Sequence, residues 1–304
     1  MRLDDYRTSD NVEDQRGTGG GGGLGFGGGG GGRGLGLIMS LIGSKFGIVG
    51  IIVVIGGAML LGINPFAGGG GTGGTIGPQR QAATNGNSAE QSCAVDAVSR
   101  FSCQVLASNE DTWNAIFQAS GERFTPARLV FYSNQGQSGC GAAQSAMGPF
   151  YCPSDNRIYL DTEFFSELQN RFNAAGDFAQ AYVIAHEMGH HIQTITGGAD
   201  KIRAAQQRAS EAEGNALQVR MELQADCYAG VWAAHNRDRL EPGDVEEGMT
   251  AANAIGDDTL QKAAGRRPVP ESFTHGTSAQ RMQWLKRGIE TGDPAQCDTF
   301  AGTL

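Results

Sequence analysis

Residues 176–196 read GDFAQAYVIAHEMGHHIQTIT and form the most clearly predicted helix of the chain. Asp177 is a natural N-cap, and Gln180 three residues later completes a capping-box pattern. The pair Gly197 and Gly198 predicts the end of the helix.

Inside this helix, residues 186–190 spell an H-E-x-x-H pattern. Residues four apart on an α-helix are separated by about 40° around its axis, so His186 and His190 project from one face. Two neutral imidazoles at this spacing are suited to a zinc ion. Glu187 is rotated by about 100° from His186 and can reach a water molecule beside the metal, where it would act as general base. The motif therefore predicts Zn²⁺ as the cofactor.

A zinc ion that activates water needs a third protein ligand. A three-histidine site of the H-E-x-x-H-x-x-G-x-x-H type is excluded, because residues 191–200 read HIQTITGGAD. Glu222 and Asp226 lie four residues apart on a second predicted helix, and so they share one face. We expect Glu222 to be the third ligand and Asp226 to accept the outer N–H of a ligand histidine, which would fix its tautomer.

Hydrolysis at such a site creates an oxyanion that needs a hydrogen-bond donor in addition to the metal. His275, in the stretch FTHGTS at 273–278, is the candidate for this role. Tyr182 and Tyr228 are alternatives, and a purely structural role for this histidine stays open.

One stretch has the length and composition needed to cross a bilayer. Residues 46–66 read FGIVGIIVVIGGAMLLGINPF, which is 21 residues without a charge. Basic residues precede this stretch and none follows until Arg80, so the positive-inside rule predicts a cytoplasmic N-terminus and an extracytoplasmic, periplasmic C-terminal part. All six cysteines follow the stretch, as expected in an oxidising compartment. The expected location is the cell membrane, with a single-pass anchor.

This prediction divides the chain into four parts. They are a cytoplasmic polar and glycine-rich tail at 1–45, a transmembrane anchor at 46–66, a flexible linker at 67–90 and an extracytoplasmic domain at 91–304. Glycine-rich matches to the dinucleotide fingerprint lie in the tail, but no strand precedes them, so they indicate only a linker. The net charge of −9 argues against a nucleic-acid partner.

Within the domain the patterns predict a mostly helical α+β fold. Residues 157–160 are expected to be an edge strand over the active-site cleft, where an extended substrate backbone could pair with it. The other expected elements are helices at 94–107 and 111–119, a strand at 127–132, a helix ending near 172, and a long helix at 199–234 interrupted near Gly214.

The chain resembles a known family over nearly its whole length. It is similar to the bacterial family described as "putative neutral zinc metallopeptidase", the YpfJ type. The matching stretches are SDNVED at 9–14, EDTW at 110–113, GCGAAQSAMGPFYCP at 139–153, GDFAQAYVIAHEMGHH at 176–191, RMELQADCYAGVW at 220–232, AIGDD at 254–258, SFTHGTSAQR at 272–281 and GDPAQC at 292–297.

The resemblance implies a gluzincin-like site. In gluzincins, H-E-x-x-H and a downstream E-x-x-x-D supply the ligands, which implies His186, His190 and Glu222 here, with Glu187 catalytic. A late T-H motif resembles membrane-peptidase relatives and supports His275 near the transition state. The implied fold is a zincin-like metallopeptidase domain, with a small sheet packed on the active-site helix.

The cysteines suggest disulfides. A bond from Cys227 to Cys297 would pin the C-terminal tail to the helix that carries Glu222, and closing this loop of about 70 residues would stabilise the fold by about 4 kcal/mol. On one continuous helix Cys93 and Cys103 would lie about 15 Å apart, so they can pair only if the chain turns between them. Free thiols remain an alternative. The favoured pairs are Cys140–Cys152 and Cys227–Cys297.

Three functions are compatible with these features. The first is a membrane-anchored zinc peptidase that hydrolyses peptide bonds of a protein or peptide substrate, using a metal-activated water and Glu187 as base. The second is another zinc amide hydrolase, such as a cell-wall amidase. The third is a non-catalytic membrane scaffold with structural zinc. Glu187 argues against the scaffold, because a structural site needs no base and is expected to have a fourth protein ligand.

Overall fold

The computed structural model describes residues 1–17, 86–172, 174–302 and 304. Helices dominate these residues, alongside one four-stranded sheet and one hairpin. The α-helices are α2 (Ala89–Cys93), α3 (Ala97–Ala119), α4 (Glu163–Phe172), α5 (Asp177–Ile195), α6 (Gly198–Gln206), α7 (Glu211–His235), α8 (Asp244–Ala254), α9 (Asp257–Ala263) and α10 (Ser278–Thr291). The 3-10 helices are η2 (Ser145–Met147), η3 (Arg237–Arg239), η4 (Pro270–Ser272) and η5 (Pro294–Cys297).

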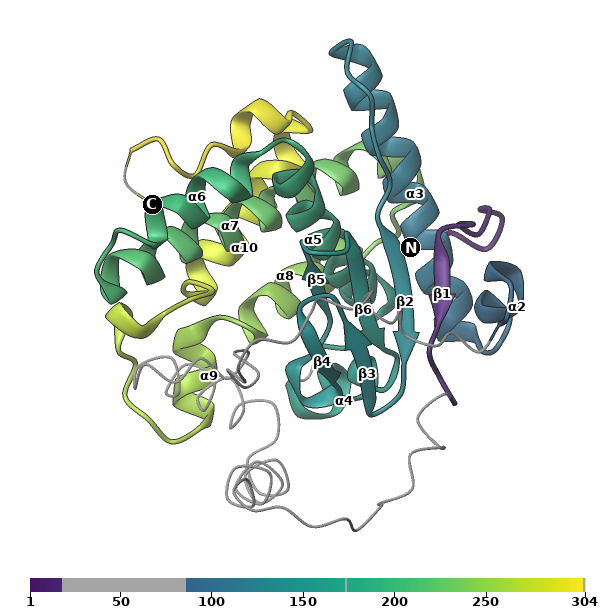
Figure 1. Ribbon diagram of the computed structural model, residues 1–304, viewed down its shortest axis with the longest axis horizontal. Coiled ribbons are helices and arrows are strands. Elements are labelled where there is room, and N and C mark those ends of the chain that lie inside the picture. Colours follow the sequence, from purple (N-terminus) through teal and green to yellow (C-terminus); the bar gives the residue numbers. More distant parts are fainter. Residues whose placement is uncertain (18–85, 173, 303) are drawn as a thin grey trace, which may run out of the picture.

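Figure 1 shows the sheet with α2 and α3 on one side of the molecule and α6 to α10 on the other. Helix α5 lies between them, contacting α3, β5 and β6 as well as α7 and α8. The expectations of a mostly helical α+β fold and of a small sheet packed on this helix are confirmed.

The four-stranded sheet has the order β1-β2-β6-β5. Its strands are β1 (Val12–Asp14), β2 (Arg128–Tyr132), β6 (Arg157–Asp161) and β5 (Phe150–Cys152), and the separate hairpin joins β3 (Gln135–Ser138) to β4 (Gly141–Gln144). The first three strands are parallel, whereas β5 runs antiparallel to β6. The expectation that residues 157–160 form an edge strand is therefore wrong, because β6 lies inside the sheet and β5 takes the edge.

Helix α5 begins at the expected residue but not with the expected cap. Its N-cap is Gly176, which has no side chain to offer, and Asp177 is the first helical residue. The Asp177 carboxylate instead accepts a hydrogen bond from the amino group of Met1 at 2.7 Å. The capping box predicted from Asp177 and Gln180 is therefore absent, because the carboxylate has a tertiary partner.

The predicted long helix is interrupted before Gly214, where α6 ends at Gln206 and α7 begins at Glu211. Ser210 caps α7 through a capping box in which its side chain accepts from the Glu213 N–H and the Glu213 side chain accepts from the Ser210 N–H. Gly214 itself lies within the first turn of α7, so the interruption occurs at the Ser210 cap and not at the glycine. Likewise, α3 is one continuous helix, because Asp96 caps it and nothing interrupts it before Ser120.

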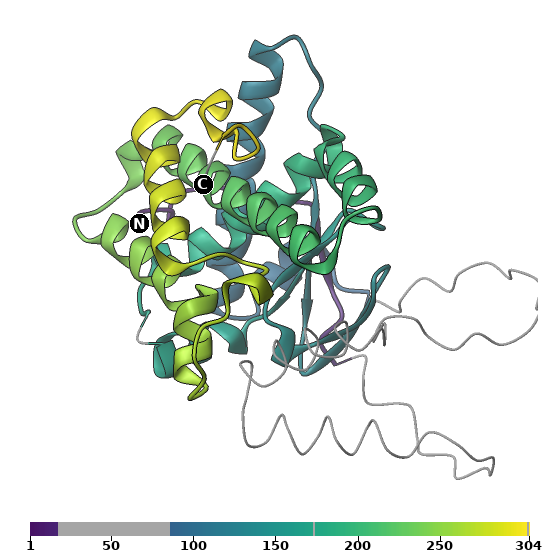
Figure 2. The same cartoon turned by 90° about the vertical axis from the view of Figure 1, so that its left-hand side faces the viewer.

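Close helix packing brings α5, α7 and α10 together. A Cβ added to Gly189 on α5 would lie 2.9 Å from the Ala225 Cα on α7, so only glycine allows the two backbones to approach this closely. On the other side of α7, a Cβ added to Gly288 on α10 would overlap the carbonyl oxygen of Cys227. Figures 1 and 2 show α10 alongside α7, as these contacts require.

The structure contains three disulfides and no free cysteine among the six. Both favoured pairs are present. Cys93 ends α2 and Cys103 lies on α3, so the chain turns between them and the pair can bond.

We expect the loss of the Cys227–Cys297 disulfide to destabilise the fold more than the loss of Cys93–Cys103. The first closes a sequence separation of 70 residues and the second one of 10. Loop-closure entropy then gives about 4 kcal/mol for the first and about 3 kcal/mol for the second. Urea unfolding of the two Cys→Ala double variants measures the difference, and an equal or reversed order would contradict the entropic explanation.

The N-terminal segment is part of the folded domain. Strand β1 pairs in parallel with β2, placing Val12 opposite Leu129. The amino group of Met1 is bound by Asp177 on α5 and by Asp244 on α8. A single membrane crossing at 46–66 would hold this segment and residues 91–304 on opposite sides of a membrane. Since they share one sheet, the predicted topology, with a cytoplasmic N-terminus and an extracytoplasmic domain, is wrong.

The expected transmembrane helix also finds no support. Among residues 1–17, 86–172, 174–302 and 304, no helix is both long and apolar enough to cross a bilayer. The stretch at 46–66 itself lies outside the described residues. The fold class is corrected accordingly to a mostly helical α+β domain with β1 contributed by the N-terminal segment.

Candidate functional site

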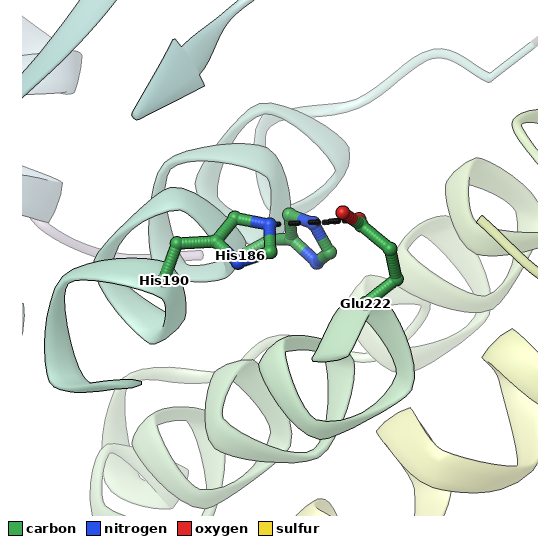
Figure 3. Close-up of side chains that lie close together, drawn as sticks. All are labelled: His186, His190 and Glu222. Carbon is green, nitrogen blue, oxygen red and sulfur yellow. Dashed lines mark hydrogen bonds and ion pairs between the residues drawn. The ribbon is translucent and has the colours of Figure 1, made fainter. Parts of the chain in front are cut away.

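Three side chains from two helices converge on one point. His186 and His190 come from α5, and Glu222 comes from α7. Figure 3 shows both imidazoles turned toward the Glu222 carboxylate. The Glu222 Oε2 atom lies 3.2 Å from the His186 Nε2 and 3.5 Å from the His190 Nε2. One ligand atom from each residue lies within 4.8 Å of the others, so a single ion could contact all three.

The charges of this cluster fit a metal cation. Burial by itself would raise the pKa of Glu222, but His190 and His186 hold it well below its ordinary range. Burial would lower the pKa of His186, but Asp226 and Glu222 raise it to about 9. Two imidazole nitrogens and one carboxylate oxygen form a donor set that zinc takes in open, three-ligand sites. The residues present therefore fit a zinc ion.

The outer nitrogen of His186 is bound by a buried ionic network. The Nδ1 of His186 lies 2.8 Å from the Asp226 carboxylate, which also accepts a hydrogen bond from the Tyr182 hydroxyl at 2.6 Å. Arg281 on α10 donates two hydrogen bonds of 2.9 Å to Asp226. Burial would raise the pKa of Asp226, but Arg281 and His186 lower it to about 2. The Asp226 carboxylate therefore lies against the outer nitrogen of His186, one turn after Glu222 on α7.

Glu187 faces the same cavity as the three potential ligands. This cavity has a volume of about 410 Å³ and is lined by His186, Glu187, His190, Glu222 and His275 among others. Burial raises the pKa of Glu187 above its ordinary value, although His186 and His190 act in the opposite direction. A buried carboxylate with a raised pKa holds a proton more readily than an exposed one.

Of the three candidate donors to an oxyanion, His275 is the one whose polar group remains available to the cavity. Its side chain is 35 % exposed and lines the cavity. The Tyr182 hydroxyl is bound to Asp226, and Tyr228 packs edge-on against Trp113 outside the cavity lining. Among these three side chains, that of His275 is therefore the one left exposed in the cavity.

Asp257 fixes the position of His275. Its carboxylate accepts hydrogen bonds from the backbone N–H groups of Thr274, His275 and Gly276 at 2.7, 2.6 and 3.1 Å. Its other oxygen lies 3.2 Å from the His275 Nδ1. Burial would lower the pKa of His275, but Asp257 and Glu222 raise it above its ordinary value.

His191 points away from the cluster. It is fully buried, and its two ring nitrogens lie 2.7 Å from the Thr125 carbonyl and 3.1 Å from the Tyr151 hydroxyl. Burial lowers its pKa, so the ring is neutral and donates from Nε2 to the carbonyl. His191 thereby ties β5 to α5, next to Glu187.

Comparison with known proteins agrees with this geometry. The model of the family described as "Putative neutral zinc metallopeptidase" matches residues 1–300. The chain belongs to this family. The match includes the N-terminal segment, which the structure also places in the fold.

Two relatives in this zinc metallopeptidase family extend over most of the chain. The protein named "Uncharacterized protein YpfJ" of Escherichia coli K12 is 44% identical over 310 residues, covering 100% of both chains. "Uncharacterized protein Rv2575" of Mycobacterium tuberculosis H37Rv is 38% identical over 262 residues, covering 80% of this chain and 85% of the relative. No solved structure matches the chain significantly. The family description names a zinc metallopeptidase, and the printed names of these two relatives state no substrate.

Several residues that support the site of this family member were not assigned from the sequence. Arg281 and Asp257 lie within stretches that carry the family resemblance, and each is a charged residue in a buried setting. Gln218 donates to the second oxygen of Glu222 at 2.9 Å. The spacing of Arg281 could have indicated its burial. It lies three residues before Trp284 and four before Leu285, which are both buried, so it shares their face of α10.

Proposed function

We propose that this chain is a zinc-dependent peptidase that hydrolyses peptide bonds in an extended protein or peptide substrate. Membership of the zinc metallopeptidase family supports the general chemistry. The observation that carries the proposal is the position of Glu187, a buried carboxylate that faces the same cavity as His186, His190 and Glu222. A site that only held a metal for structure would need no base there.

His186, His190 and Glu222 would hold the zinc ion. When bound, zinc acts as a Lewis acid that lowers the pKa of water and polarises the substrate carbonyl. Glu187 would take the proton of the attacking water and deliver it to the leaving amine, because its raised pKa suits both steps. The Asp226 carboxylate would keep the proton of His186 on Nδ1, leaving Nε2 free to act as a ligand.

His275 would donate a hydrogen bond to the oxyanion that forms as the carbonyl is attacked. A donor contributes most when it is already oriented before the reaction. The Asp257 carboxylate provides that orientation through the backbone N–H of His275 and through its ring.

Strand β5 would bind the substrate backbone. It forms the edge of the sheet, and Phe150, Tyr151 and the following Pro153 line the cavity. An extended peptide can add to such an edge by backbone hydrogen bonds. The reaction site would then lie beside it, because Glu187 lines the same cavity as these residues.

Removal of the metal should abolish hydrolysis. The test uses the full chain, because residues 1–17 belong to the fold, and follows cleavage of a mixed peptide library by mass spectrometry. We expect cleavage that stops when a chelator removes the metal and returns when zinc is added at one equivalent. A protein that binds one zinc but cleaves only cell-wall peptide fragments would replace the peptidase with an amidase. A folded protein that binds no zinc would refute the proposal.

A further inference from the structure

The outer ring nitrogen of His190 has a different kind of hydrogen-bond partner from that of His186. The Nε2 of His190 faces Glu222, and its Nδ1 lies 2.9 Å from the side-chain oxygen of Gln193. Gln193 lies one turn further along α5 and is 2 % exposed. The outer nitrogen of His190 therefore meets a neutral amide, whereas that of His186 meets a carboxylate.

The amide of Gln193 has only one orientation that satisfies its neighbours. Its nitrogen donates to the Met221 carbonyl at 2.7 Å and to the Gln224 side-chain oxygen at 3.1 Å. A carbonyl can only accept, so the NH₂ group must face Met221 and the oxygen must face His190. This oxygen requires a proton on the Nδ1 of His190, which leaves Nε2 as the unprotonated nitrogen that a metal needs.

Gln193 is itself held by the helix that supplies the third ligand. Met221 directly precedes Glu222 on α7, and Gln224 follows two residues later. Gln224 donates in turn to the carbonyl of Cys297 at 3.0 Å, and Cys297 is bonded to Cys227 on α7. A continuous set of hydrogen bonds thus runs from the disulfide-anchored tail through two amides to His190.

We propose that Gln193 is a positioning residue for the metal. It sets the tautomer and the ring orientation of His190 and locks this ligand to the α7 segment that carries Glu222. A neutral acceptor does this without adding a further negative charge to a site that already contains Glu222 and Asp226. The inference rests on the proposed zinc site, but it does not depend on which bond the enzyme hydrolyses.

Two substitutions separate positioning from simple packing. Gln193→Leu removes both the acceptor for His190 and the donors to α7. Gln193→Glu also removes the two N–H donors, but it keeps an oxygen facing His190 whether the carboxyl is ionised or protonated. Gln180→Leu is the matched control, because Gln180 lies on the same helix and its side chain makes no hydrogen bond within the described residues.

We expect the Leu variant to bind zinc about 10- to 100-fold more weakly than wild type, measured by competition with a chromophoric chelator. The Glu variant should bind zinc nearly as tightly as wild type, although both variants should melt at a lower temperature without metal. In the zinc-loaded protein, the His190 Nδ1 proton resonance should move downfield in the Glu variant and upfield in the Leu variant. The Gln180→Leu control should match wild type in affinity.

Equal loss of zinc affinity in the Leu and Glu variants would overturn the proposal, since affinity would then follow packing rather than the acceptor. Unchanged affinity in the Leu variant would overturn it as well. Failure of the wild type to bind zinc would instead refute the proposed function, and the two failures are thereby distinguished.

Discussion

Replacing Glu187 with glutamine is expected to leave one zinc ion bound and to lower kcat for peptide hydrolysis by about 10²- to 10⁴-fold. Glutamine has nearly the same shape as glutamate and keeps one side-chain oxygen that can accept a hydrogen bond. It cannot take a proton from water at neutral pH. The three potential zinc ligands are untouched, so the loss should appear in kcat and not in metal content, measured by mass spectrometry of the intact protein.

Glu246→Gln provides the control for this experiment. Glu246 is exposed on α8, and the same chemical change there should leave both kcat and zinc content unchanged. A Glu187→Gln variant that hydrolyses peptides at the wild-type rate would show that another group takes the proton. Loss of zinc from that variant would show that Glu187 holds the metal rather than the proton.

The part of the site that follows from local geometry was predictable from the sequence. His186 and His190 share a helix face because they are four residues apart, and Glu222 and Asp226 share another for the same reason. The structure brings these two faces together. The contact itself depends on Gly189, where a side chain would collide with Ala225, and this close approach could be understood only from the fold.

The residues that orient the ligands were not predictable in the same way. Arg281 reaches Asp226 from α10, and Asp257 reaches His275 across a loop. Gln193 is a neutral amide whose partners lie on α7. These pairings join distant parts of the chain, and no periodicity in one segment specifies the partner in another.

The N-terminal segment shows how a composition rule can mislead. The positive-inside prediction counted Arg2, Arg7 and Arg16 as charges on a cytoplasmic tail. In the structure Arg7 pairs with Asp111 on α3, Arg16 donates to the Ser99 hydroxyl and the Ser92 carbonyl, and Arg2 donates to the Asp238 carbonyl in η3. Their role is to attach this segment to the domain, and a count of charges along the sequence cannot distinguish the two uses.

Asp226→Asn is expected to destabilise the protein by about 3–5 kcal/mol. Arg281 is 2 % exposed, and its guanidinium group has the Asp226 carboxylate as its charged partner. Asparagine keeps an oxygen for Tyr182 or His186 but removes the carboxylate that forms the hydrogen-bonded ion pair with the buried arginine. Removing one member of a buried ion pair is costly because the remaining charge stays desolvated.

The double variant Asp226→Asn with Arg281→Met tests this explanation. It removes both charges, so most of the lost stability should return, and the two single effects should not add. Stability is measured by urea unfolding with a chelator present, because bound zinc would add its own binding energy to the folded state. As a control, Glu290→Gln breaks the exposed pair with Lys286 and should change stability by less than about 1 kcal/mol.

Zinc affinity should respond differently from stability in the two single variants and the double variant of Asp226 and Arg281. The double variant still lacks the carboxylate that makes His186 a stronger ligand, so its zinc affinity should stay about 10- to 100-fold below wild type even where its stability recovers. Recovery of both quantities would mean that Asp226 serves mainly to neutralise Arg281. Recovery of neither would mean that the shape of the ion pair, rather than its charge, holds α10 against α7.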